Sequence, residues 1–223
     1  VRSRGLGDVY KRQDSPDNLG KIPTSLLDVQ TDAIPDGFLE RVDGFFLEMI
    51  ELLGQRTGEM HLALAEGGKN PAFTPEAFSK LYQRSLYQSL RSLTRRIMSM
   101  MKKVKRNISD DILPGVEEFI AREGEILERF ATITATKIDA KKIRIHGDYH
   151  LGQVLFTGRD FVIIDLEGEP ARTLSERRLK FSAFRDVAGM LRSFHYAIYG
   201  RYLETIAIRP EDGPRLEAWI RPW

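Results

Sequence analysis

The residues between 143 and 169 include a set of polar side chains whose types and order suit one kind of chemistry. Asp148 follows a short apolar run, Gln153 lies five positions later, and Asp165 ends a second apolar run. A carboxylate in a loop can accept the proton of an alcohol while that alcohol attacks a phosphoryl group. An amide oxygen and a second carboxylate are hard ligands of the kind that Mg²⁺ prefers. The order therefore predicts phosphoryl transfer, with Asp148 as the catalytic base and with Gln153 and Asp165 as magnesium ligands.

Nearby polar residues are candidates for supporting this site. Glu167 and Glu169 follow the second predicted magnesium ligand, and they can reach a second metal ion, a substrate hydroxyl or a neighbouring arginine. His146 is expected to brace the loop from beneath, and His150 is expected to pack or to bind substrate. Asp186 lies where a helix is expected to begin, so the helix dipole stabilises its charge. We also expect Asp186 to bond back to the catalytic loop and to hold it rigid.

Each predicted site residue also has a purely structural interpretation. Asp148 can cap a turn, Gln153 can bond to backbone, and Asp165 can form an ion pair with Arg185. Taken singly, each of these residues is better explained by its structural role. The ordered combination of HGDxxxxQ, a hairpin and DxE favours the functional interpretation, and it keeps Arg185 as a candidate on the substrate side.

A second kind of chemistry is open to the same loop. His146, Asp148 and His150 alternate along the sequence, so in an extended segment all three side chains face one side. Such a group is the start of a zinc or iron site and would suit a metallohydrolase. That enzyme would need further ligands, and His61 and His195 are the only other histidines.

The composition predicts a soluble globular protein. Of 223 residues, 42% are apolar and 30% are charged, and 34 basic against 32 acidic residues leave a net charge of +2. A general nucleic-acid binder usually carries a larger basic excess, and no apolar run approaches the roughly 20 residues of a membrane helix. The absence of cysteine excludes disulfides and thiolate metal sites. Without a recognisable signal peptide, we expect a cytoplasmic protein that binds neither nucleic acid nor membrane.

The chain is expected to divide into three parts. Residues 1–13 are basic but lack the apolar core of a signal peptide, so we interpret them as an extraneous or disordered arm. Residues 14–37 contain three prolines among scattered apolar residues and predict an irregular linker. One domain then fills residues 38–223, with a helical part at 38–135, a catalytic loop and hairpin at 143–170, and C-terminal helices at 182–223.

The spacing of apolar residues changes from helical to extended after residue 132. Helices are predicted at 38–65, 75–106 and 114–132, the second of them beginning at the cap Thr74-Pro75-Glu76. Short strands follow at 143–146, 154–156 and 161–164, with a hairpin turn at Gly158-Arg159, and helix returns after Pro170. The fold class is therefore mostly α with a small β-hairpin region, α+β.

The helix predicted at 75–106 carries basic residues in its last turns, which opens a different class of function. Positive charge there stabilises the negative end of a helix, and such residues usually form a solvated face. A non-catalytic interaction module would instead use this helix as a docking arm. The basic residues concerned are Arg95, Arg96, Lys102, Lys103, Lys105 and Arg106.

Several stretches resemble the C-terminal lobe of bacterial maltokinases, a family that includes kinase domains fused to trehalose synthase. They are HGDYHLGQVL, then DFVIIDLEGEPARTLSERR and RDVAGMLRSFHYA, and LLGQRTGEMHLALA upstream is similar as well. The likeness spans residues 39–223 and is densest between 143 and 197. It implies the C-terminal lobe of a protein-kinase-like, aminoglycoside-phosphotransferase-like fold.

The resemblance also implies an activity. Maltokinases convert maltose and ATP to maltose 1-phosphate and ADP, which feeds glycogen and α-glucan synthesis. Carried over by position, Asp148 corresponds to the catalytic base, and Gln153 and Asp165 correspond to the Mg²⁺ ligands. Maltose and ATP are then the expected substrates, and a trehalose synthase, fused or separate, is a candidate partner.

Departures from the general kinase pattern qualify this expectation. Gln153 stands where asparagine is usual, and Asp-Leu-Glu at 165–167 replaces Asp-Phe-Gly; both are consistent with the maltokinase branch. Nothing before Leu39 supplies the N-terminal lobe that covers ATP, with its phosphate-contacting lysine. We therefore expect a C-lobe fragment, inactive alone, of an ATP-dependent maltokinase. The alternative is a kinase of the same plan for another small alcohol, such as an aminoglycoside or choline.

Overall fold

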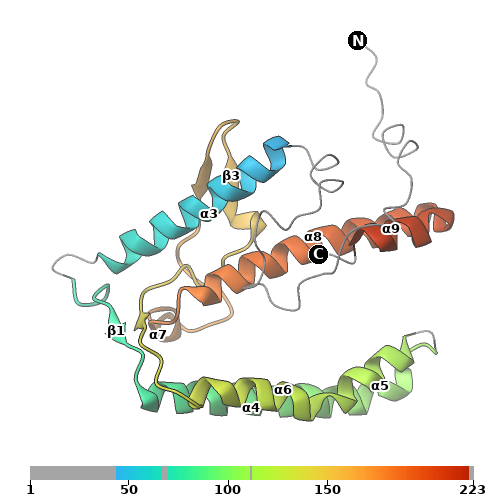
Figure 1. Ribbon diagram of the computed structural model, residues 1–223, viewed down its shortest axis with the longest axis horizontal. Helices are drawn as coiled ribbons and strands as arrows, with labels where there is room; N and C mark the ends of the chain where they lie inside the picture. The colour runs from blue at the N-terminus through green and yellow to red at the C-terminus, as the bar shows by residue number, and fades with distance from the viewer. Residues whose placement is uncertain (1–43, 67–69, 111, 221–223) are drawn as a thin grey trace.

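The computed structural model describes residues 44–66, 70–110 and 112–220 (Figure 1). The N-terminal arm predicted at 1–13 and the linker predicted at 14–37 lie outside these residues, as does the start of the first predicted helix. The described part is mostly helical, with two small two-stranded antiparallel sheets. It therefore agrees with the fold class expected from the sequence. None of its helices is both long and apolar enough to span a membrane.

The long helix α8, Phe184–Ile208, runs between two groups of elements (Figure 1). One group contains α3, Gly44–Ala65, and the hairpin of β3, Val154–Phe156, and β4, Phe161–Ile163. The other contains α4, Lys80–Val104, α5, Leu113–Ala121, and α6, Glu123–Ala131. The remaining helical segments are η3, Lys105–Asn107, η4, Thr132–Thr134, η5, Leu151–Gln153, α7, Leu174–Arg177, η6, Pro210–Asp212, and α9, Gly213–Ile220.

A buried glutamine joins α4 to the segment between α6 and β2. Gln83 is 1% exposed, and its amide nitrogen donates to the carbonyl oxygens of Ile133, at 2.5 Å, and Thr136, at 2.7 Å. A buried amide is tolerated when its hydrogen bonds are made. These bonds therefore fix the backbone that follows α6 against α4.

The predicted start of the second helix is wrong. Glu76–Ala77 forms strand β1, which pairs antiparallel with β2, Lys141–Lys142, and α4 begins only after Ser79. The Ser79 hydroxyl accepts the N–H of Tyr82 and is the actual cap. The Thr-Pro-Glu signal is local, and it is overridden because β1 gains a distant strand partner. The helix predicted at 75–106 is accordingly shorter, and η3 follows it.

The prediction of one continuous helix at 114–132 is also wrong. The structure has two helices there, α5 and α6, because Arg122 leaves the helical region with φ −84° and ψ 9°. The Arg122 N–H bonds to the carbonyls of Glu118 and Phe119, which closes α5, and Gly124 lies just inside the next helix. Glycine is a poor helix former, so the break falls where continuation is weak.

The strand predicted at 143–146 is not formed as such. Ile143 makes a bridge with Phe181, with two N–H to carbonyl bonds of 2.9 Å, but the ladder does not continue. The N–H of His146 instead donates to the side chain of Asp186 at 2.8 Å. A side chain has therefore replaced a neighbouring strand as the hydrogen-bond partner of His146, and residues 144–146 form no strand.

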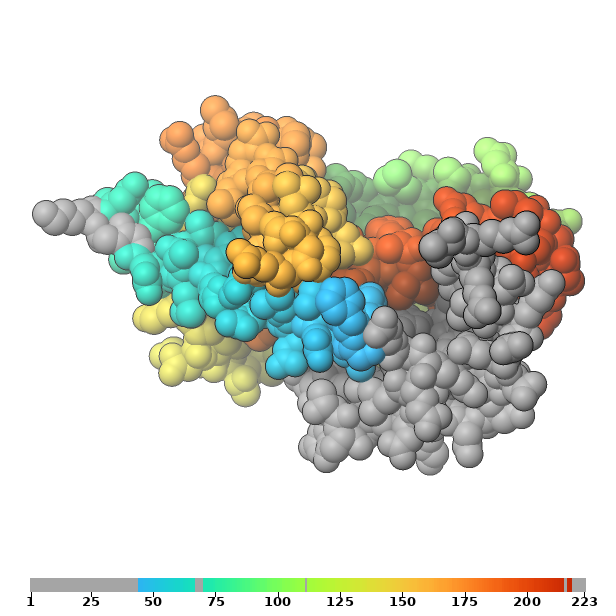
Figure 2. All heavy atoms as spheres, turned by 90° about the horizontal axis from the view of Figure 1, so that it is seen from above, coloured from blue at the N-terminus to red at the C-terminus, as the bar shows by residue number. Residues whose placement is uncertain are grey.

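The predicted hairpin is present. β3 and β4 pair in the register Val154 with Ile163, and Gly158 in the turn has φ +94°, a conformation that favours glycine. The hairpin lies over the N-terminal half of α3 (Figure 2). Arg56 of α3 donates twice to the carboxylate of Asp160, at 2.8 and 3.1 Å, and so fixes the hairpin tip to the helix.

A small apolar core connects the elements that surround the loop at 146–153. Leu53 of α3, Tyr149 of the loop and Met190 of α8 are buried together. Residues of η5, of the hairpin and of α8 pack against them: Leu151, Val154, Phe161, Ile163 and Phe194. Leu191, next to Met190 in α8, is 47% exposed. The core thus holds the loop between two helices and the hairpin.

The ion pair between Arg56 and Asp160 predicts a pH dependence of stability. The hydrogen bond from Arg56 lowers the pKa of Asp160 below its ordinary value of 3.8. A lowered pKa in the folded state stabilises the fold above the unfolded pKa, and this contribution is lost as the pH falls through the folded pKa. Asp160→Asn should therefore be less stable than wild type at pH 7, with the difference shrinking below about pH 4.

Urea unfolding between pH 3 and pH 7 measures this difference. Asp139→Asn is the matched control, because Asp139 is exposed and has no ion pair among the described residues. A constant difference between Asp160→Asn and wild type across this pH range would contradict the prediction.

Candidate active site

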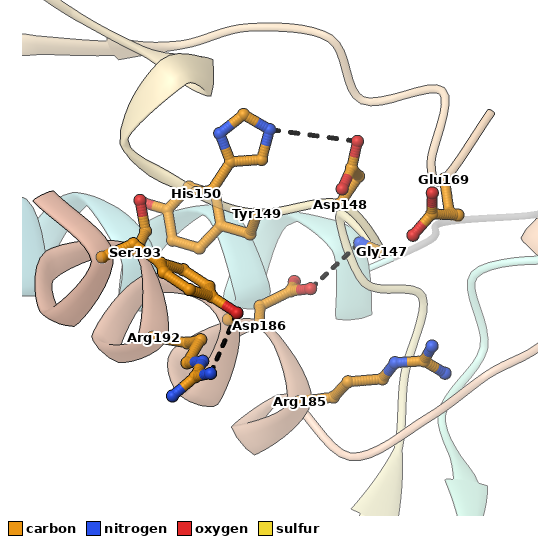
Figure 3. Close-up of a pocket in the computed structure, with 11 residues that line it drawn as sticks. Gly147, Asp148, Tyr149, His150, Glu169, Arg185, Asp186, Arg192 and Ser193 are labelled. Atoms are coloured by element: carbon orange, nitrogen blue, oxygen red, sulfur yellow. Dashed lines mark hydrogen bonds and ion pairs between the residues drawn. The ribbon is translucent and has the colours of Figure 1, made fainter. Parts of the chain in front are cut away.

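The loop at 146–153, here called the Asp148 loop, is anchored at its start by a buried carboxylate. Asp186 is 1% exposed; one of its oxygens accepts the N–H of His146 at 2.8 Å, and the other accepts the N–H of Gly147 at 2.9 Å (Figure 3). His61 Nε2 of α3 is hydrogen-bonded to the same carboxylate at 3.0 Å. The expected contact from Asp186 back to the loop is therefore present, in the first turn of α8.

Two further residues of the same helix face hold the rest of the loop. The Ser193 hydroxyl accepts the N–H of Leu151 at 2.9 Å. A Cβ at Gly189 would lie 2.7 Å from the carbonyl oxygen of Tyr149, so only glycine lets α8 approach this closely. Asp186, Gly189 and Ser193 are spaced by three and four residues, which places them on one side of a helix.

Tyr149 fixes the loop on its other side. Its ring is 3% exposed, and its hydroxyl is hydrogen-bonded to the hydroxyl of Thr57 at 2.7 Å. Burial raises the pKa of the Tyr149 hydroxyl. Because Tyr149 is turned into the core, the preceding residue, Asp148, is turned the other way, toward the cavity.

His146 supports the loop and is not placed as a metal ligand. Its Nε2 is hydrogen-bonded to the carbonyl oxygen of Ile164 at 2.8 Å, and its Nδ1 accepts the N–H of Asp148. Both ring nitrogens are thus engaged with backbone, and the ring is 1% exposed. Within 44–66, 70–110 and 112–220, no group of three His, Asp or Glu side chains is placed to hold a metal ion. The alternative metallohydrolase site of His146, Asp148 and His150 is therefore wrong.

Asp148 faces a cavity of about 470 Å³ between the Asp148 loop and α8. Figure 3 shows its carboxylate between His150 on one side and Glu169 on the other. His150 Nε2 lies 4.0 Å from a carboxylate oxygen of Asp148, and its Nδ1 accepts the N–H of Gly152. His150 thus contributes to the cavity wall and also caps η5.

Charged residues of both signs line the rest of the cavity. Glu169 lines it, whereas Glu167 is exposed and does not. Arg185 stacks on the ring of Phe181 at 4.5 Å, and burial lowers the pKa of its guanidinium. Arg192 donates to the hydroxyl of Tyr196 at 2.9 Å. The cavity therefore offers two carboxylates and two guanidinium groups to a polar ligand.

The structure brings the two predicted magnesium ligands together. Gln153 Nε2 donates to a carboxylate oxygen of Asp165 at 3.1 Å, so Asp165 is paired with Gln153 and not with Arg185. Asp165 has φ +63° and is the one non-glycine residue with a positive φ in the described ranges. Non-glycine residues in this region are uncommon and strained, and such strain gathers at functional sites.

Close backbone contacts place this pair beside the Asp148 loop. Gly147 and Gly168 have φ +86° and +82°, and a Cβ at Gly147 would lie 3.5 Å from the Cα of Gly168. The bond from His146 to the carbonyl of Ile164 joins the same two segments. The segments that carry Asp148 and Asp165 are therefore neighbours, although their residues are separated by the hairpin.

Several residues that build the site were missed by the sequence reasoning. Thr57, Gly189, Arg192 and Ser193 lie within the stretches that resemble maltokinases, but no role was assigned to them, and His61 was considered only as a remaining histidine. The spacing of Asp186, Gly189 and Ser193 along one helix was a usable signal. No sequence spacing indicated the contacts of Thr57 and His61, because α3 is far from the loop in the sequence.

Comparison with known proteins finds similarity to glucosamine kinases. The chain is 28% identical over 178 residues to a glucosamine kinase of Streptacidiphilus jiangxiensis, covering 75% of this chain and 34% of that protein. A glucosamine kinase of Mycolicibacterium smegmatis (strain ATCC 700084 / mc(2)155) is 40% identical over 73 residues, which cover 32% of this chain and 18% of that protein. No family model matches the chain.

A solved structure supports the fold. A glucosamine kinase in its crystal form B superposes with a TM-score of 0.53 at 22% sequence identity, covering 76% of this chain and 36% of that one. The fold is therefore that of the matched part of a glucosamine kinase, which agrees with the kinase-like class expected from the sequence. The chain spans about a third of the length of the Streptacidiphilus relative. The absence of an N-terminal lobe stays a prediction.

The bonds of Asp186 predict the effect of a nearly isosteric change. Asp186→Asn keeps one accepting oxygen but turns an amide NH₂ toward a backbone N–H or toward His61. A buried donor left without a partner costs about 1–3 kcal/mol. We expect the free energy of unfolding to fall by about 2 kcal/mol, and the amide of Gly147 to exchange hydrogen faster.

Urea unfolding and amide hydrogen exchange measure these effects, with Asp110→Asn, an exposed aspartate, as the control. Unchanged stability together with unchanged exchange at Gly147 would mean that the carboxylate does not hold the loop.

Proposed function

We propose that this chain carries the acceptor side of the active site of an ATP-dependent sugar kinase. The observation that supports the proposal most strongly is the position of Asp148, exposed to a cavity and held by a loop that α8 and α3 both anchor. Phosphoryl transfer depends mainly on positioning and charge stabilisation, so a rigid carboxylate beside an acceptor cavity is what it requires. The similarity to glucosamine kinases supports the same reaction class.

The reaction assigns a defined role to Asp148. A sugar hydroxyl lies beside its carboxylate and attacks the γ-phosphorus of ATP. A bond forms between the sugar oxygen and phosphorus, the bond from phosphorus to the β–γ bridging oxygen breaks, and ADP leaves. Asp148 accepts the hydroxyl proton. The bonds that hold Tyr149 and Gly147 keep this carboxylate in line with the acceptor.

Gln153 and Asp165 fit the magnesium that such a reaction uses. Their side chains lie within hydrogen-bond distance of each other and supply oxygen ligands, while a kinase magnesium takes its further ligands from phosphate and water. The amide of Gln153 turns about its last bond to present its oxygen. When bound, Mg²⁺ neutralises the charge on the transferring phosphates.

An amino sugar of the glucosamine class is the acceptor that we favour. Both sequence relatives are glucosamine kinases, and Glu169 lines the cavity close to Asp148 (Figure 3). A carboxylate pairs with a protonated amine through a charge-assisted hydrogen bond. The guanidinium of Arg192 is engaged with Tyr196, and that of Arg185 stacks on Phe181.

Maltose is the second candidate acceptor. The motifs HGDYHLGQVL and DLEGEPARTLSERR support it, since they resemble those of maltokinases. Transfer would then go to the anomeric hydroxyl, with the same role for Asp148. A trehalose synthase partner and a link to glycogen synthesis belong to this candidate alone.

Replacement of Asp148 tests the assigned role. In the full-length gene product, Asp148→Asn should lower kcat by about two to four powers of ten, as expected for a general base, with little change in the acceptor KM. Steady-state kinetics measures both constants. Asp139→Asn is the control, and turnover of Asp148→Asn near the wild-type value would disprove the role.

A panel of acceptors identifies the substrate. With radiolabelled ATP, the full-length gene product should label glucosamine in preference to N-acetylglucosamine, glucose, maltose, an aminoglycoside or choline. Glu169→Gln should raise the KM for glucosamine by roughly tenfold or more, the effect of losing one charge-assisted bond. Glu167→Gln is the matched control, because Glu167 does not line the cavity. Labelled maltose with silent glucosamine would favour the second candidate.

A further inference from the structure

A second cavity lies on the far side of Arg185, away from Asp148. It has a volume of about 340 Å³. Six of its lining residues matter here: Glu76, Tyr82, Lys142, Arg178, Lys180 and Phe181. Phe181 forms the boundary between the cavities, because Arg185 of the first cavity stacks on its ring. Nothing in the proposed phosphoryl transfer uses the second cavity.

Positive charge is in excess around this cavity. Lys142, Arg178 and Lys180 line it, and Glu76 is the one acidic residue beside them in its wall. Arg178 is exposed and has no ion pair among the described residues. Burial, and after it the neighbouring charge of Arg178, lower the pKa of the Arg144 guanidinium, so a fourth cation lies nearby.

The two lysines are already arranged around an anion. The ammonium of Lys142 lies 2.9 Å from one carboxylate oxygen of Glu76, and that of Lys180 lies 2.9 Å from the other. Both lysine side chains are mostly buried, at 15% and 10% exposure, while Glu76 is 52% exposed. The lysines are thus fixed by their surroundings, and the carboxylate that joins them can move into water.

We propose that this cavity binds a phosphate monoester or inorganic phosphate, with Lys142, Lys180 and Arg178 as its ligands. A phosphate dianion carries more charge and more acceptor oxygens than a carboxylate, so it can bind both ammonium groups and the guanidinium at once. The exposed Glu76 side chain gives way to it. The rings of Tyr82 and Phe181 line the same cavity and offer apolar faces to the carbon skeleton of an ester.

The proposal makes opposite predictions for two variants. Arg178→Ala should weaken binding by about tenfold or more, because it removes one charge-assisted contact. Glu76→Gln should tighten binding severalfold, because it removes the competing negative charge and frees the lysines. Neither substitution creates a cavity in the core, since both side chains are exposed. A purely structural role of the Glu76 ion pairs predicts no gain in binding from Glu76→Gln.

Isothermal titration of the full chain with inorganic phosphate and with glucose 6-phosphate tests these predictions in a phosphate-free buffer. Arg159→Ala is the control for loss of an exposed arginine, and Arg192→Ala reports on the cavity beside Asp148. Tighter binding of glucose 6-phosphate than of phosphate assigns the site to phosphate esters, and equal binding assigns it to phosphate itself.

Three results would overturn the proposal: no heat with either probe, loss of binding in Arg192→Ala but not in Arg178→Ala, or weaker binding in Glu76→Gln. These results are separate from the proposed kinase activity, because that activity is read from phosphoryl transfer with Asp148 variants.

Discussion

The site depends on one buried carboxylate. Burying a charged group is costly unless hydrogen bonds replace the water that it loses. Asp186 receives two backbone N–H bonds and a contact from His61, so its burial is compensated by groups that come from the Asp148 loop and from α3. The same bonds that make the burial tolerable therefore fix the loop. The N–H of His146 is thereby paired with a side chain and not with a neighbouring strand.

The other supports extend this arrangement along α8. Gly189 allows the backbone of Tyr149 to approach the helix, and Ser193 bonds to the backbone of Leu151. Because Tyr149 is buried between α3 and α8, its neighbour Asp148 has to face outward. Helices α3 and α8 thus position a short loop, and the Asp148 carboxylate faces the cavity. Such an arrangement suits a group whose value lies in its position.

The parts that the sequence predicts well are those with local causes. The hairpin follows from two β-branched runs around Gly158, whose positive φ suits glycine. The expected proximity of Gln153 and Asp165 is confirmed by their hydrogen bond, whereas the catalytic and metal-binding roles assigned to this pair and to Asp148 stay predictions. The prediction of the start of α4 was wrong for the opposite reason. Thr74-Pro75-Glu76 is a good helix signal, but Glu76 pairs with Lys142, far along the chain. His61 and Thr57 were likewise hidden, because their partners are Asp186 and Tyr149.

Arg185 connects the cavity beside Asp148 to the second cavity. It lines the cavity of Asp148, yet its guanidinium rests on Phe181, which lines the other one. Phe181 is itself fixed by its bridge to Ile143, the residue that leads into the Asp148 loop. A ligand that moved the Phe181 ring would therefore act on a charged wall of the cavity beside Asp148 and on the backbone just ahead of the loop. The contact between Arg185 of one cavity and Phe181 of the other couples the two cavities, since packed side chains transmit displacement.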